Sequence, residues 1–170
     1  MIRPAVWPSR ASGARDPAMV DLDRLVAIEA IRSLQSRYVR LADSKDWGAL
    51  ARLFLPHGTF MVHDLEGRLQ LVLTGREQII ERLSHTIGGG ATIHHLLSYE
   101  IEIEAPARAH GVWAMEDWVD LSGENGSGEG VAQFRALHGC GHYHVDYEMM
   151  DDAWHIATQR LYRTRLDIVR

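Results

Sequence analysis

The apolar residues of this chain change their period near residue 88, and this change constrains the fold more than any other feature. Before it, from Leu22 to about Ala42, apolar residues recur at the spacing of a helix that packs on one side. Beyond it, four long runs are rich in β-branched and aromatic residues, as strands are: 91–104, 107–121, 131–149 and 153–166. Helices followed by consecutive strands indicate an α+β fold, with helices on one face of an antiparallel sheet.

Shorter elements are predicted between the first helix and the glycine run at 88–90. We expect a short helix after Asp46, a hairpin with its turn at Glu66-Gly67, and a third helix capped by Thr74 with Glu77 as its capping-box partner. The expected ranges are 47–54 for the short helix, 58–64 and 68–73 for the hairpin strands, and 74–87 for the third helix. The predicted architecture is a cone, in which a curved mixed or antiparallel sheet and three helices enclose an apolar pocket.

Length and charge narrow the class of protein. The chain of 170 residues fits one domain, which we place at 21–170. Residues 1–20 lack the apolar segment of a secretory signal, so we expect a disordered extension, with Met19 as an alternative start. The net charge of -5 argues against nucleic acid as a partner, because binding it needs clustered basic residues. No stretch approaches the roughly 18–20 apolar residues that span a membrane.

The only cysteine and a group of histidines share one expected strand. Cys140 cannot form an internal disulfide, which fits a reducing, cytoplasmic compartment, and its glycine neighbours favour a packing role. His138, His142 and His144 lie on one face of that strand, with a spacing that suits a metal ion. No carboxylate or cysteine obviously completes this set. A solvent or interface face is therefore the favoured interpretation, and we expect no metal and no cofactor.

Asp43 and His94 are the candidates for catalysis. Asp43 stands at the end of the first helix, and His94 opens the first long strand. A carboxylate that accepts a hydrogen bond from one imidazole nitrogen fixes the tautomer and leaves the other nitrogen for proton transfer. Spacing alone does not bring the two together, since a helix-end aspartate is also a common cap and a strand histidine is also a common core residue.

Alternation along the strands separates an inner face from an outer face. The inner set is expected to line the pocket and bind the substrate: Trp113, Met115, Asp117, Val119 and Tyr143. Trp118, His142 and His144 point the other way. We expect this convex face to be covered in a homodimer or homotrimer.

Three segments carry a resemblance to a known family. Residues 43–47 (DSKDW), the segment around His94, and the C-terminal run from Tyr143 through 151–156 (DDAWHI) are similar to the corresponding stretches of scytalone dehydratase. The wider group is the SnoaL-like branch of the NTF2-like (cystatin-like) superfamily, which includes bile-acid 7-alpha-dehydratase and hexachlorocyclohexane dehydrochlorinase. The resemblance runs from about Leu22 to Arg165.

The resemblance implies roles for particular residues. It implies that Asp43 orients His94, that His94 moves the proton of an elimination, and that Tyr38 polarises a substrate carbonyl. The same comparison leaves open whether Arg160 or Gln159 takes the place of an arginine on the last strand.

From the residues and the resemblance together, we expect a cofactor-independent lyase. The most direct form is a dehydratase that acts on a hydrophobic cyclic molecule of polyketide, steroid or terpenoid type. The alternatives are an isomerase or cyclase with the same dyad, and a non-catalytic ligand-binding or assembly domain.

Overall fold

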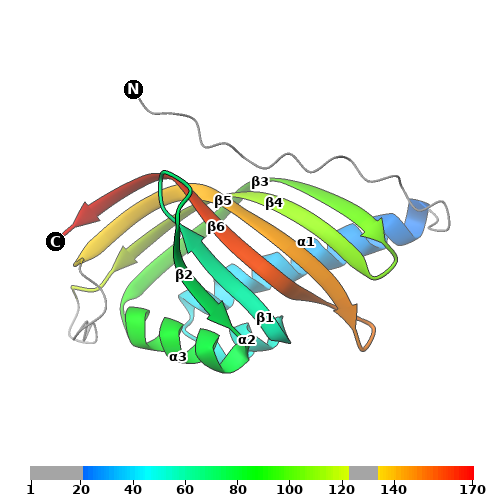
Figure 1. Ribbon diagram of the computed structural model, residues 1–170, viewed down its shortest axis with the longest axis horizontal. Helices are drawn as coiled ribbons and strands as arrows, with labels where there is room; N and C mark the ends of the chain where they lie inside the picture. The colour runs from blue at the N-terminus through cyan, green and yellow to red at the C-terminus, as the bar shows by residue number, and fades with distance from the viewer. Residues whose placement is uncertain (1–20, 123–133) are drawn as a thin grey trace.

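The computed structural model describes residues 21–122 and 134–170 (Figure 1). The elements follow in this order: α1 (Asp21–Asp43), α2 (Trp47–Arg52), β1 (Phe54–His63), β2 (Leu69–Thr74), α3 (Arg76–Ile87), β3 (Ala91–Ala105), β4 (Arg108–Asp120), β5 (Ala136–Met150) and β6 (Ala153–Val169). The predicted α+β class and its helix-then-strand order are confirmed. The expected extension at 1–20 lies outside the described residues. No described helix combines the length and the apolar character needed to cross a membrane.

The described strands form one mixed six-stranded sheet in the order β2-β1-β6-β5-β4-β3. The pair β1–β6 is parallel, and every other pair is antiparallel. Figure 1 shows the four long strands arching over α1, with α2 and α3 beside the short strands β1 and β2. The curved mixed sheet is therefore as predicted, with its helices on the concave side.

Two irregularities decide which side chains reach the concave side. In β3 the register shifts between Leu96 and Tyr99, and in β6 it shifts between Ile156 and Thr158. Because side chains alternate along a strand, an extra residue moves the following positions to the other face. The first shift lets His94 and Ile103 face inward from one strand, although their parities differ.

Helix α1 buries a narrower stripe than its periodicity indicated. Ile31, Leu34 and Tyr38 are at most 4% exposed, whereas Leu22 and Leu25 are 67% and 63% exposed. The inward stripe therefore starts after the first turn of the helix. The core that it joins is closed by Phe54 from the start of β1 and by aromatic residues of the long strands.

Several predicted boundaries are wrong, each for a local reason. The short helix ends at Arg52, and Phe54 already belongs to β1, whose bulged start accommodates Pro56. Thr74 ends β2 instead of capping α3; Gly75 is the cap residue and makes no side-chain cap bond. The Thr74 N–H donates to Gln78 Oε1 at 3.0 Å, so Gln78 takes the place expected for Glu77.

The start of the third long strand was also predicted too early. β5 begins at Ala136, and positions 134–135 precede it. The remaining part of that expectation, 131–133, lies outside the described residues.

Candidate active site

The end of α1 is built to hold Asp43 toward the sheet. The Asp46 N–H donates to Leu41 O at 3.1 Å and the Lys45 N–H to Ala42 O at 3.2 Å, which is the hydrogen-bond pattern of a Schellman motif. Lys45 adopts φ 62°, a left-handed position that glycine usually takes and that costs another residue about 1–2 kcal/mol. Its ammonium group donates to Ala42 O and to Asp43 O, so the side chain caps the helix that carries Asp43.

Asp43 meets the first residues of β3 through both carboxylate oxygens. Oδ1 lies 2.6 Å from His94 Nδ1 and accepts a 3.0 Å hydrogen bond from the Thr92 hydroxyl. Oδ2 accepts from the backbone N–H of His94 at 3.1 Å. With Nδ1 held by the carboxylate, Nε2 is the imidazole nitrogen left for a substrate.

The dyad is sheltered but accessible. The side chains of His94 and Asp43 are 15% and 29% exposed, values that suit a site open to a small molecule. Partial burial is the largest single influence on Asp43 and acts to raise its pKa, but the hydrogen bonds from His94 and Thr92 together outweigh it. The pKa of Asp43 therefore lies below its ordinary value, and the group is ionised at neutral pH.

Lys45 and Thr92 extend the dyad and were missed as site residues. The Lys45 ammonium donates to the Thr92 hydroxyl, which in turn donates to Asp43. Burial lowers the pKa of Lys45, and the negative charge of Asp43 partly offsets this. Lys45 is the only lysine among 18 basic residues. A single lysine in an arginine-rich chain was the sequence feature that could have indicated a specific role for Lys45.

Tyr38, which is also on α1, is buried more deeply than Asp43 and His94. It is 4% exposed and packs edge-on against Phe54 and Tyr143, with ring centroids 6.1 Å and 5.9 Å away. Burial raises the pKa of its hydroxyl well above the ordinary value, so Tyr38 stays protonated and able to donate. The Gln159 amide opposes that rise, although its Nε2 has no acceptor in good geometry among the described residues.

A buried hydrogen-bonded chain occupies the centre of the sheet. Trp113 Nε1 donates to the Tyr147 hydroxyl at 2.9 Å, Tyr147 donates to Gln35 Oε1 at 2.9 Å, and Gln35 Nε2 donates to Gln159 Oε1 at 3.1 Å. Trp113 therefore presents only its apolar ring to the interior. Gln159 is the inward residue of the pair left open by the sequence, whereas Arg160 faces outward and binds Asp146 at 2.8 Å.

The inward arginine of β6 is Arg163, which the sequence analysis did not single out. It forms a bidentate salt bridge with Asp117, in which Nη1 and Nη2 donate to Oδ1 and Oδ2 at 2.5 and 2.7 Å. Both side chains are less than 10% exposed. Burial opposes the charge, yet the hydrogen bonds and charge of Asp117 raise the pKa of Arg163, so the guanidinium stays ionised. Gly139 makes room for it, because a Cβ there would lie 2.1 Å from Arg163 Nη1.

The remaining predicted lining residues also face inward. Met115, Val119 and Tyr143 are at most 5% exposed. A hollow of about 480 Å³ lies instead beside Ile93, Trp118 and His138 on the outer face of the sheet. We place the candidate chemistry at the dyad, since the paired proton-transfer groups are there and the outer hollow does not include them.

Comparison with known proteins fits this geometry. Residues 23–160 match the sequence profile of the SnoaL-like domain. The chain belongs to the SnoaL-like family. A curated protein named "Probable cyclase FGR4", from Gibberella zeae, is 24% identical over 143 residues, which cover 81% of this chain and 91% of that protein.

Two solved structures show the same fold. Hexachlorocyclohexane dehydrochlorinase (LinA) type 2 has a TM-score of 0.71 at 19% identity and covers 89% of this chain and 94% of its own. The match to a candidate scytalone dehydratase from Novosphingobium aromaticivorans has a TM-score of 0.69 at 18% sequence identity. It covers 89% of this chain and 93% of the dehydratase chain. The predicted SnoaL-like, NTF2-like fold is confirmed.

The state of Asp43 in this SnoaL-like domain can be tested without a substrate. A carboxylate whose pKa is lowered on folding adds stability above its unfolded pKa, ordinarily 3.8, and loses that contribution as the pH falls through the folded value. We expect the free energy of unfolding of Asp43→Asn to differ from wild type by a constant amount above about pH 5, well above the unfolded pKa of 3.8, and by progressively less as the pH falls below that. Urea unfolding from about pH 5 to about pH 2 measures this. A difference that persists unchanged at the acid end would contradict an ionised, hydrogen-bonded Asp43.

Proposed function

We propose that this SnoaL-like domain is a cofactor-independent lyase, a dehydratase that uses His94 as its acid–base group and Asp43 as the residue that positions it. The observation that carries the proposal is the 2.6 Å contact between Asp43 Oδ1 and His94 Nδ1 at a partly exposed position. General acid–base catalysis by a positioned imidazole of this kind typically contributes about 10²- to 10⁴-fold.

The elimination balances with these two residues alone. His94 Nε2 removes a proton from the carbon next to a substrate carbonyl, and the electrons of that C–H bond form a double bond. The neighbouring C–O bond breaks, and the leaving hydroxide takes the proton back from the imidazolium as water. Asp43 stabilises the transient imidazolium, and the Tyr38 hydroxyl is a suitable donor to the carbonyl oxygen, where negative charge develops.

The inward-facing residues near the dyad favour a hydrophobic substrate. Met115, Val119 and the Trp113 ring present apolar surface, while the charges of Asp117 and Arg163 neutralise each other. A cyclic molecule of polyketide, steroid or terpenoid type has the apolar surface to match this and the carbonyl that the mechanism requires.

A cyclase or isomerase reaction is the second candidate. It is favoured by the similarity to the protein named "Probable cyclase FGR4" over most of both chains. The first step is the same proton removal by His94, but the carbanion attacks a second carbon or is reprotonated, and no water leaves.

Incubation in D₂O with a panel of cyclic β-hydroxy ketones separates these functions. A dehydratase gives products lighter by one water, while an isomerase or cyclase gives deuterium incorporation or a shifted retention time without that loss. Neither change with any member of the panel, alongside saturable binding of the same compounds, would favour a non-catalytic binding domain. His94→Ala is the control, because it removes the acid–base group in either reaction.

We also propose that the outer face of the sheet is covered in a homodimer or homotrimer. Ile93, Trp118 and Val169 are 53%, 48% and 57% exposed there, an unusual amount of apolar surface for a monomer. Sedimentation equilibrium at micromolar concentration is expected to give two or three times the chain mass of 19.2 kDa. A single species at 19.2 kDa would contradict this.

A further inference from the structure

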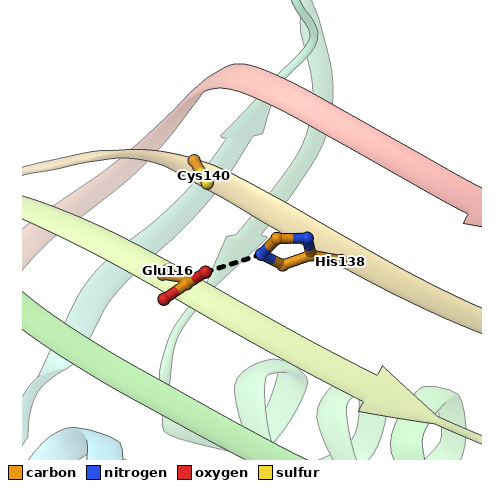
Figure 2. A group of neighbouring side chains, drawn as sticks. All are labelled: Glu116, His138 and Cys140. Atoms are coloured by element: carbon orange, nitrogen blue, oxygen red, sulfur yellow. Dashed lines mark hydrogen bonds and ion pairs between the residues drawn. The ribbon is translucent and has the colours of Figure 1, made fainter.

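Strand register gathers a second set of reactive side chains on the outer face, away from the dyad. Across β4 and β5, Glu116 pairs with Cys140 and Trp118 pairs with His138. On the other side, His95 of β3 pairs with Glu116. Figure 2 shows the Glu116, His138 and Cys140 side chains gathered over β4 and β5. The strand face that carries His138, His142 and His144 therefore also has a carboxylate and a thiol beside His138. The spacing within β5 alone did not indicate this grouping.

The donor atoms are close enough to share one ion. One ligand atom each from Glu116, His138 and Cys140 lies within 4.8 Å of the other two. Glu116 Oε1 and His138 Nε2 are already 2.7 Å apart. Zinc binds such ligands at about 2.0–2.3 Å in a tetrahedron, so its ligand atoms lie about 3.4–3.8 Å apart. Small rotamer adjustments bring the three atoms to such separations, since none lies farther than 4.8 Å from another.

The neighbouring residues orient these donors. Trp118 stacks on the His138 ring at 3.7 Å with an 11° interplanar angle, which holds the imidazole plane. Asp167 Oδ2 lies 3.9 Å from His138 Nδ1, on the side away from Glu116. A carboxylate hydrogen-bonded to the far nitrogen of a histidine ligand is the common outer arrangement of zinc sites; at 3.9 Å Asp167 lies beyond hydrogen-bond distance and must approach by about 1 Å to provide it. His95 Nδ1 lies 3.4 Å from Glu116 Oε2 and leaves Oε1 for the site.

We propose that Glu116, His138 and Cys140 form a binding site for a divalent transition-metal ion of the zinc class. The set of one thiolate, one imidazole and one carboxylate selects zinc over magnesium or calcium, which take oxygen ligands. Binding replaces the Glu116–His138 hydrogen bond with two bonds to the metal and releases the thiol proton of Cys140. Three protein ligands leave a fourth position, beside the hollow lined by Trp118, Ile93 and His138.

The single cysteine makes this site measurable in the unmodified full chain. Cys140 is the only thiol, so a thiol-alkylating reagent reports on it alone. Because the thiolate is both the nucleophile and the ligand, bound Zn²⁺ should slow alkylation by about tenfold or more, and excess chelator should restore the rate. Alkylation that proceeds in the metal-free chain and is unchanged at Zn²⁺ concentrations well above that of the protein would overturn the proposal.

Cobalt(II) gives an independent spectroscopic readout. A thiolate–Co²⁺ charge-transfer band in the near ultraviolet, with intense visible bands, is expected in the wild-type chain and not in Cys140→Ser. Glu116→Gln and His138→Gln should each weaken Zn²⁺ binding by about tenfold or more. His110→Gln is the matched control, since His110 forms a 2.9 Å carboxylate pair with Asp146 on the same face and its paired strand offers no thiol there.

The outcomes decide the proposal in either direction. Loss of Zn²⁺ affinity in Glu116→Gln and His138→Gln, with His110→Gln unchanged, supports the assigned ligands. Equal losses in all the variants, or binding that survives in Cys140→Ser at wild-type strength, would place the metal elsewhere. Turnover by the dyad is not involved in any of these measurements, so their failure and the failure of the proposed lyase activity are distinguishable.

Discussion

Asp43→Asn is expected to lower turnover by about 10²- to 10⁴-fold while leaving the fold in place. The amide keeps the shape of the side chain and can still accept one hydrogen bond, but it carries no charge to stabilise the imidazolium of His94. Because the Asp43 side chain is 29% exposed, the cost to stability should stay near the 1–3 kcal/mol of a weakened charged hydrogen bond. Turnover of an accepted substrate, with thermal melts alongside, measures both quantities.

The controls for this prediction come from the same helix end. Asp46→Asn is the matched change, since Asp46 Oδ1 caps α2 by accepting from the Ala49 N–H at 2.9 Å and asparagine caps about as well. His94→Ala should lose at least as much activity as Asp43→Asn, and the double variant little more, because residues that act as one unit are not additive. Tyr38→Phe should cost about 1–3 kcal/mol of transition-state stabilisation.

The Asp43–His94 dyad can also be tested by spectroscopy, which needs no substrate. In wild type, nitrogen-detected spectra should show a His94 proton on Nδ1, the nitrogen 2.6 Å from Asp43. In Asp43→Asn the tautomer should shift or become mixed, while Asp46→Asn should match wild type. A folded, fully active Asp43→Asn variant with unchanged His94 tautomer would rule out the dyad.

How much of this fold the sequence predicts depends on whether a structural feature is determined by neighbouring residues or by residues far apart in the chain. Alternation along β4 placed Trp113, Met115 and Asp117 on one face, because period-two patterning needs only neighbouring residues. It failed at Arg163, which faces inward because β6 shifts register between Ile156 and Thr158, a break that no local pattern reveals. Arg160 and Gln159 were the candidates from the sequence, and Arg163 was not among them.

The residues of the candidate site were likewise predicted only in part. Asp43 and His94 were found as separate signals, a helix end and a strand start, but their contact depends on how α1 crosses β3. Lys45 was missed because a lysine in a left-handed position is not a pattern that spacing predicts. The grouping of Glu116 with Cys140 was missed because cross-strand neighbours are set by register, which links residues far apart in the chain.

The buried pair on the inner face should dominate the response of this domain to single substitutions. Asp117→Ala is expected to destabilise the protein by about 3–5 kcal/mol, since it leaves the Arg163 guanidinium charged and unpaired at 9% exposure. Urea unfolding at neutral pH measures the change. The expected loss is a large fraction of the 5–15 kcal/mol that stabilises a typical domain.

Asp146→Ala is the matched control for Asp117→Ala, because Asp146 pairs with Arg160 at 2.8 Å on the outer face, where both side chains are more than 20% exposed. Asp146 also holds His110 at 2.9 Å, and these two partly exposed pairs should together contribute about 1–2 kcal/mol or less. Replacing both inner partners, as Asp117→Leu with Arg163→Met, should recover most of the lost stability, since the cost comes from an uncompensated buried charge and not from the absence of the pair. If Asp117→Ala cost no more than Asp146→Ala, Arg163 would have to reach solvent in the variant, and the inner face would be more open than its burial indicates.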